Sequence, residues 1–244
     1  MQLSKRLQVV ADMVTFGSRV ADIGCDHAYV SIYLIEHEIS PHIIAMDVNQ
    51  GPIDRAKDNI VKYGYENRIE TRKSDGLEKL NAGEADTILI AGMGGALTVQ
   101  ILTDRLEVLQ SVKELVLQPQ SETGKVRHML QEQNFLIIDE SMIKEDGKYY
   151  VMMKAVHADR KAEPQADYIL KKPEHFHYGR MLLEQKHPVL KEFLQWEYNL
   201  CEGIMQSLLQ ERTDHIRQRQ KEIMDRMRLI QSGLLYYSID FINQ

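Results

Sequence analysis

The chain has 244 residues, of which 43% are apolar and 27% are charged, and its net charge of −6 argues mildly against a general nucleic-acid binder. This size and composition exclude a disordered chain and a disulfide miniprotein. No apolar run approaches the roughly 20 residues that span a bilayer, and no signal peptide is expected. The two cysteines, Cys25 and Cys201, lack metal-ligand spacing. We therefore expect a reduced cytoplasmic protein without a membrane or metal partner.

Short apolar runs alternate with amphipathic stretches through the first 156 residues. Strands are predicted at residues 20–24, 43–47, 69–73, 85–91 and 115–117, and helices at residues 27–37, 52–63, 97–102 and 125–133. This βαβα order predicts an α/β fold with a parallel sheet that carries helices on both faces.

Two strand-like runs, residues 135–143 and 149–156, follow each other without a helix between them. The Asp146–Gly147 pair between them is a hairpin turn signal. We therefore expect a Rossmann-like, mostly parallel sheet that ends in an antiparallel hairpin.

The composition changes after residue 156. A polar, proline-containing linker covers residues 157–173, and apolar residues then recur at helical spacing through residues 190–208 and 216–234. A short polar turn joins these two segments, which predicts an antiparallel α-helical coiled coil. The expected domains are residues 1–158 and residues 159–244.

The ends of the first two strands carry polar residues at the edge where such sheets bind ligands. The first strand ends in Asp22, Gly24, Cys25, Asp26 and His27. Gly24 allows close approach of a ligand, although a glycine turn with an aspartate helix cap explains these residues equally well.

The second strand ends in Asp47 and Val48, 23 residues after Gly24, where an acidic residue can bind both ribose hydroxyls of a nucleoside; a simple cap is the alternative.

The third and fourth strands also end in candidate ligand-binding segments. Ser74, Asp75 and Gly76 could bind an adenine amine or form a common Asp-Gly turn. The loop of Ala91, Gly92, Met93 and Gly94 is rich in glycine, which has no side chain. It could allow close approach of a ligand, or it could allow a helix to pack closely on the sheet.

The glycine pattern separates two nucleoside cofactors. A nicotinamide dehydrogenase needs G-x-G-x-x-G to bind a pyrophosphate, but Asp26 stands where the next glycine would be. A carboxylate disfavours a diphosphate and favours a cationic ligand without phosphate. S-adenosylmethionine fits this description. The terminal antiparallel hairpin also fits the methyltransferase version of this sheet, so a dehydrogenase is disfavoured.

Five motifs occur in the order found in a known family: ADIGCDHAY from residue 21, MDVNQGP from residue 46, SDGL from residue 74, AGMGG from residue 91 and LQPQ from residue 117. With them the chain resembles the bacterial tRNA (adenine-22-N1)-methyltransferases over nearly its whole length. The resemblance implies a class I methyltransferase fold, S-adenosylmethionine as methyl donor and tRNA as substrate. A methyltransferase for another RNA or a small molecule, and a non-catalytic module acting through the coiled coil, are the alternatives.

The resemblance also implies residue roles. Asp22, Gly24 and Asp26 would line the methionine end of the cofactor, Asp47 would hold the ribose, and residues 74–76 the adenine. Asp26 could stabilise the cationic product and His27 could accept the proton that is lost. Tyr29 could stack on the target base, or it could be a core aromatic.

The candidate tRNA contacts are basic residues near the N-terminus and in the coiled coil: Lys5, Arg6, Arg212, Arg217, Arg219 and Lys221. Acidic residues are interspersed among those of the coiled coil, so a solvated, salt-bridged face is an equal alternative. We expect a monomer.

Overall fold

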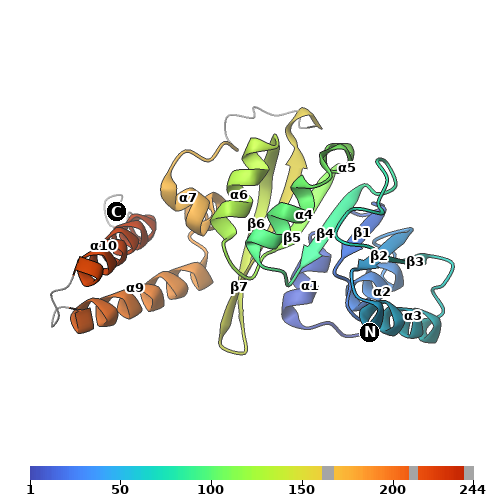
Figure 1. The fold of residues 1–244 in the computed structure, drawn as a ribbon, viewed down its shortest axis with the longest axis horizontal. Helices are drawn as coiled ribbons and strands as arrows, with labels where there is room; N and C mark the ends of the chain where they lie inside the picture. Colours follow the sequence, from blue (N-terminus) through green and yellow to red (C-terminus); the bar gives the residue numbers. More distant parts are fainter. Residues whose placement is uncertain (161–167, 209–213, 239–244) are drawn as a thin grey trace, which may run out of the picture. The chain divides into compact units, whose positions relative to one another are not determined.

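The chain divides into two compact units, Met1–Ile169 and Leu170–Gln244. The structure is a computed structural model that describes residues 1–160, 168–208 and 214–238. The first unit contains a mixed sheet with its helices, and the second is helical (Figure 1). From the sequence we place the boundary after residue 158, and the division seen here falls after Ile169.

The first unit is built on one seven-stranded sheet of order β3-β2-β1-β4-β5-β7-β6. Strands β1 to β5 are parallel, and β7 pairs antiparallel with both β5 and β6. This topology confirms the predicted Rossmann-like sheet with its terminal hairpin. The strands are β1 (Val20–Ile23), β2 (Ile43–Asp47), β3 (Ile69–Lys73), β4 (Thr87–Ala91), β5 (Glu114–Gln118), β6 (Phe135–Glu145) and β7 (Lys148–His157).

Burial explains why the central strands read as continuous apolar runs. Every residue of β1 and β5, and the first four of β4, are buried because helices cover both faces of the sheet. The centres of β4 and β5 are therefore apolar, with polar residues such as Glu114 and Gln118 at the ends of β5. The hairpin turn has Asp146 at φ 50° and Gly147 at φ 75°. Two successive positive φ angles are typical of a tight hairpin turn, as the Asp-Gly pair predicts.

Helices α1 to α3 cover one face of the sheet and α4 to α6 the other (Figure 1). Helices α1 and α5 were not predicted; α1 begins where the Ser4 hydroxyl accepts a hydrogen bond from the Leu7 amide. The helices are α1 (Lys5–Asp12), α2 (Tyr29–Glu36), α3 (Gln50–Tyr63), α4 (Gly95–Thr103), α5 (Leu106–Ser111) and α6 (Thr123–Glu132), with a 3₁₀ turn η1 (Ala158–Arg160) after β7.

The second unit contains the short helices α7 (Pro173–Tyr178) and α8 (Arg180–Glu184) and the long helices α9 (Pro188–Leu208) and α10 (Asp214–Leu235). The long helices pack antiparallel, since Arg226 of α10 is paired with Glu197 of α9 while Gln220 donates to the carbonyl of Leu208. The predicted helix pair is therefore present, whereas α7 and α8 were not predicted. Within the described parts of the chain, no helix is long and apolar enough to cross a membrane.

Candidate active site

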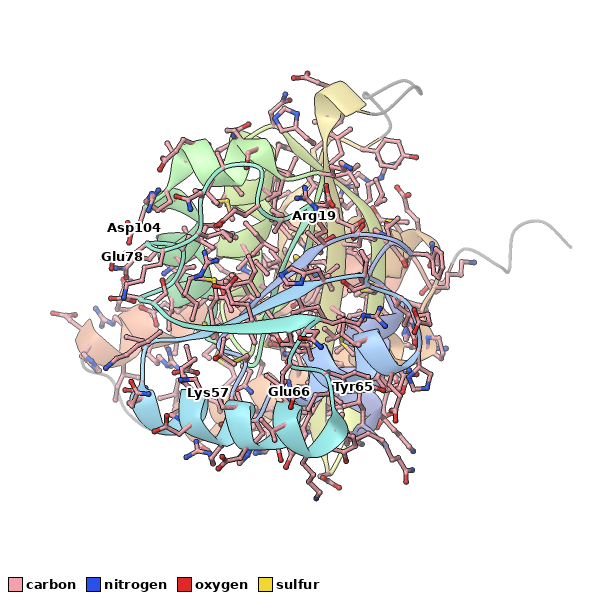
Figure 2. All side chains as sticks on the ribbon, turned by 90° about the vertical axis from the view of Figure 1, so that its right-hand side faces the viewer. Arg19, Lys57, Tyr65, Glu66, Glu78 and Asp104 are labelled. Atoms are coloured by element: carbon pink, nitrogen blue, oxygen red, sulfur yellow. The ribbon has the colours of Figure 1, made fainter. Side chains whose placement is uncertain are left out.

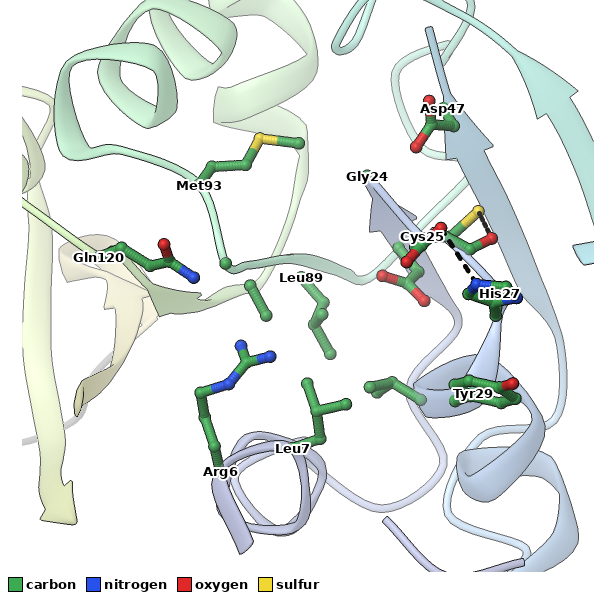
Figure 3. A pocket seen from close by; sticks show the side chains of 15 residues that line it. Arg6, Leu7, Gly24, Cys25, His27, Tyr29, Asp47, Leu89, Met93 and Gln120 are labelled. Carbon is green, nitrogen blue, oxygen red and sulfur yellow. Dashed lines mark hydrogen bonds and ion pairs between the residues drawn. The ribbon is translucent and has the colours of Figure 1, made fainter. Parts of the chain in front are cut away.

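A pocket of about 360 Å³ lies at the carboxyl ends of β1, β2 and β4 (Figure 3). This volume is in the range of small-molecule and cofactor sites. The structure brings eleven of the candidate residues to its lining: Arg6, Asp22, Gly24, Cys25, Asp26, His27, Tyr29, Asp47, Ala91, Gly92 and Met93.

Gly24 lines this pocket without a side chain. Its φ of +75° is unfavourable for other residues, and a Cβ at this position would lie 2.2 Å from the Met93 Cε atom. Asp26 and Ala28 also have positive φ angles, 42° and 57°. Asp26 and Ala28 are non-glycine residues in this left-handed region, so the loop stores backbone strain of the kind that is frequent at functional sites.

Asp22 places a buried carboxylate in the wall of the pocket. It is 3% exposed, and the Ser31 hydroxyl donates a 2.6 Å hydrogen bond to its Oδ2 atom. Burial raises the pKa of Asp22 to about 6, against the lowering effect of Ser31, and the nearby charge of Asp47 adds to the rise. At neutral pH the wall is therefore anionic and favours a cationic ligand.

Cys25 lines the pocket but is not suited to be a nucleophile. Burial raises the pKa of its thiol, and the carboxylates of Asp22 and Asp47 raise it further. Because the thiolate is the reactive form, a neutral buried thiol is inert. Cys25 therefore contributes shape to the pocket.

Asp26, His27 and Tyr29 line the pocket, and Figure 3 shows His27 and Tyr29 on the same side of it. Asp26 does not cap α2, whose N-cap residue is Ala28 without a side-chain bond. Its carboxylate accepts a 3.1 Å hydrogen bond from Arg55 and lies 3.7 Å from the His27 Nε2 atom. The His27 and Tyr29 rings stack at 5.2 Å, and Tyr29 is 42% exposed, so it is not a core aromatic.

The sequence leaves open whether Asp47 binds a ligand or is a simple cap, and its position in the structure is compatible with both. Its Oδ1 atom accepts a 2.8 Å hydrogen bond from the Asn49 amide, which orders the loop before α3. The same residue lines the pocket, whereas its neighbour Val48 is half exposed outside the lining.

The candidate adenine residues do not line this pocket. The buried Ser74 hydroxyl bonds within its own loop, donating to the Gly76 carbonyl and accepting from the Lys79 amide. Asp75 and Gly76 line a second cavity, of about 290 Å³. Glu78 and Asp104, which also line that cavity, lie close to each other in Figure 2.

The remaining candidates near the pocket differ in their placement. Gly94 is the N-cap of α4 and does not line the pocket, and neither does the exposed Lys5. Arg6 enters it from α1 and donates a 2.6 Å hydrogen bond to the Gln118 Oε1 atom. The lining also includes Gln120, which sequence reasoning quoted only as part of the LQPQ motif.

The candidate tRNA contacts of the second unit lie on α10. Arg217 pairs with Asp214 at 3.3 Å and Arg219 with Glu222 at 2.9 Å, while Lys221 is exposed. These pairs fit a solvated face as well as a phosphate-binding face, and Arg212 lies outside the described residues. Among the described residues, no group of three potential ligands could hold a metal ion.

Residues 3–153 match the methyltransferase domain family. The chain is 36% identical to the tRNA (adenine(22)-N(1))-methyltransferase of Bacillus subtilis over 94% of its own length and 96% of that protein. It belongs to the tRNA (adenine-22-N1)-methyltransferase family.

Solved structures of this family superpose on the whole chain. The B. subtilis m1A22 tRNA methyltransferase TrmK is 35% identical with a TM-score of 0.86, covering 96% of this chain and 99% of that one. M. capricolum TrmK, solved in complex with S-adenosyl-homocysteine, is 27% identical with a TM-score of 0.82, covering 97% and 99%. The likeness therefore includes both units.

Proposed function

We propose that the pocket of Figure 3 binds S-adenosylmethionine and that Asp26, His27 and Tyr29 act on the target base beside it. As a member of its family, the protein is an S-adenosylmethionine-dependent methyltransferase that modifies N1 of adenine 22 in tRNA. The observation that carries the assignment of the pocket is its buried carboxylate, Asp22, beside a glycine that lets a ligand reach the backbone.

The residues of the pocket fit this cofactor. Asp22 and Asp26 would face its cationic methionine end, and Asp47 its ribose hydroxyls. Gly24 and the glycine loop leave room for close approach. The second cavity beside Asp75 and Gly76 would take part in binding the adenine of the cofactor.

When bound, S-adenosylmethionine supplies a methyl group that adenine N1 takes with its lone pair, releasing S-adenosylhomocysteine. Neutral adenine is already nucleophilic, so the task of the protein is to hold N1 in line with the methyl group. Asp26 stabilises the cationic adenine that forms, and His27 accepts the proton that is finally lost. Tyr29 stacks on the base after it has turned out of the tRNA.

Single-turnover methyl transfer from labelled S-adenosylmethionine tests this proposal. Transcripts that carry adenine or guanine at position 22 are compared, with wild-type protein, Asp26→Ala and the control Asp139→Ala, which changes an exposed aspartate of β6. We expect labelling of the adenine transcript alone, a loss of at least 100-fold in Asp26→Ala and no loss in the control. A wild-type rate in Asp26→Ala would refute the role of this carboxylate.

We also propose that the protein acts as a monomer in the cytoplasm, where its tRNA substrate is found. The basic residues of α10, with Lys5 and Arg6, would contact tRNA phosphates. Residues 171–191, in the same unit as α10, carry five Lys/Arg against two Glu and would add further positive charge.

A further inference from the structure

The wall of the pocket opposite the aspartates has a different chemistry. Asp22 and Asp47 belong to β1 and β2. Arg6 and Gln120 enter from α1 and from the segment after β5, on the side away from Asp47 in Figure 3. Gly92 lies between them: a Cβ there would be 3.6 Å from Arg6 Nη1 and 3.7 Å from Gln120 Nε2. If the acidic wall holds the cofactor, as proposed above, this second wall faces the target base.

The backbone of the second wall is fixed by the sheet. The Gln120 amide donates a 2.8 Å hydrogen bond to the Met93 carbonyl, and the Gly92 amide a 3.1 Å bond to the Gln118 carbonyl. These bonds extend the β4–β5 pairing into both loops. Gln120 thus projects from a rigid segment, which is the arrangement that precise recognition requires.

Arg6 is part of this wall, and the buried Gln118 holds it in place. Gln118 is fully buried, and its Oε1 atom accepts the bond from Arg6, whose guanidinium lies 5.5 Å from the Tyr150 ring centroid. The Gln118 Nε2 atom has no hydrogen-bond partner among the described residues. This atom is buried away from the pocket, whose lining includes Arg6 and Gln120 but not Gln118, so Gln118 acts on the wall through the hydrogen bond that holds Arg6.

We propose that Gln120 selects adenine by reading the N6 amine and N7 of the target base with its side-chain amide. The Oε1 atom accepts from N6–H while Nε2–H donates to N7, the bidentate geometry by which glutamine recognises adenine. This edge leaves N1 free to take the methyl group. Guanine presents the O6 acceptor in place of N6–H, so the same amide disfavours it.

The proposal rests on the proposed function and is tested with tRNA transcripts that carry adenine or 7-deazaadenine at position 22. The analogue keeps N1 and N6 but has C–H in place of the N7 acceptor. For wild-type protein we expect kcat/KM to fall about 5-fold to 150-fold with the analogue, the discrimination available to a bidentate pair. In Gln120→Ala and Gln120→Met the two transcripts should react at equal rates, both slower than the wild type with adenine.

The control is Gln133→Ala, which removes an amide at the end of α6 and should keep the wild-type ratio. Cofactor affinity, measured by calorimetry with S-adenosylmethionine alone, should be unchanged in both Gln120 variants and shows that they are folded. Equal discrimination by wild type and Gln120→Ala would overturn the assignment of Gln120. Failure of the wild type to methylate any transcript would instead overturn the proposed function.

Discussion

Replacing Asp22 by asparagine should make the free protein more stable while it removes cofactor binding. Asparagine has nearly the same shape, and its Oδ1 atom can still accept the hydrogen bond from Ser31. The variant therefore deletes the buried charge and little else. We expect the ionised Asp22 to lower the free energy of unfolding while it favours binding of the cationic cofactor, and this substitution separates the effect on stability from the effect on binding.

The magnitude follows from the pKa. Folding raises the pKa of Asp22 from its ordinary 3.8 to about 6, and each unit of pKa corresponds to about 1.4 kcal/mol. The ionised carboxylate therefore costs the folded state up to about 3 kcal/mol above pH 6. The folded state binds the Asp22 proton more tightly than the unfolded state does. Below pH 4 the carboxyl is protonated in both states and the wild type carries no penalty, whereas its free energy of unfolding falls by up to about 3 kcal/mol as the pH rises to 6.

Urea unfolding at several pH values measures this difference. Asp22→Asn should exceed the wild type by up to about 3 kcal/mol at pH 8, and the gap should close as the pH falls from 6 to 4. Ser31→Ala, which removes the hydrogen bond to the same carboxylate, should destabilise by about 1–3 kcal/mol at pH 8.

Calorimetry in the same buffers should show loss of S-adenosylmethionine binding in Asp22→Asn, and weaker wild-type binding below pH 6. An Asp22→Asn variant that is less stable than the wild type, by an amount independent of pH, would refute the reasoning.

Three further outcomes are expected. Gly24→Ala should weaken S-adenosylmethionine binding in calorimetry, because alanine disfavours the backbone φ of +75° and its Cβ would displace the Met93 side chain, which also lines the pocket. Gly95→Ala should destabilise the protein by at least about 1–3 kcal/mol in urea unfolding, because its Cβ would lie 2.4 Å from the Ser121 carbonyl oxygen. Replacing the three described basic candidates of α10 with glutamine should flatten the plot of log tRNA affinity against log salt, by about 0.9 for each lost duplex contact; an unchanged slope would assign these residues to a solvated face.

Most of the sheet was predictable because its strands are short and buried. β4 carries an apolar run at residues 88–91 and β5 one at residues 115–117, and short apolar runs of this kind are typical of strands covered on both faces. The hairpin turn was likewise predictable, because the pair Asp146–Gly147 favours the positive φ angles that this turn requires. Helices α5, α7 and α8 escaped prediction because five or six residues give too few repeats for a helical period to be recognised.

The two walls of the pocket differ in how far the sequence reveals them. The acidic wall is encoded locally, since Gly24, Asp26 and Asp47 each follow a recognisable strand and parallel strands end at the same edge. The opposite wall depends on contacts between residues more than 110 positions apart, such as Arg6 and Gln118. No local sequence pattern therefore indicates that the side-chain amide of Gln120 lies beside the pocket.

The net charge of −6 conceals how the charges are distributed. Asp22 and Asp47 are brought together on one wall, where burial makes each charge count for more than it does in water. Asp26 is partly neutralised by Arg55, and the arginines of α10 are paired with acidic neighbours. In the proposed function, binding of the cationic cofactor depends on the first arrangement, and binding of tRNA would depend on how readily the α10 pairs exchange partners. The overall charge predicts neither.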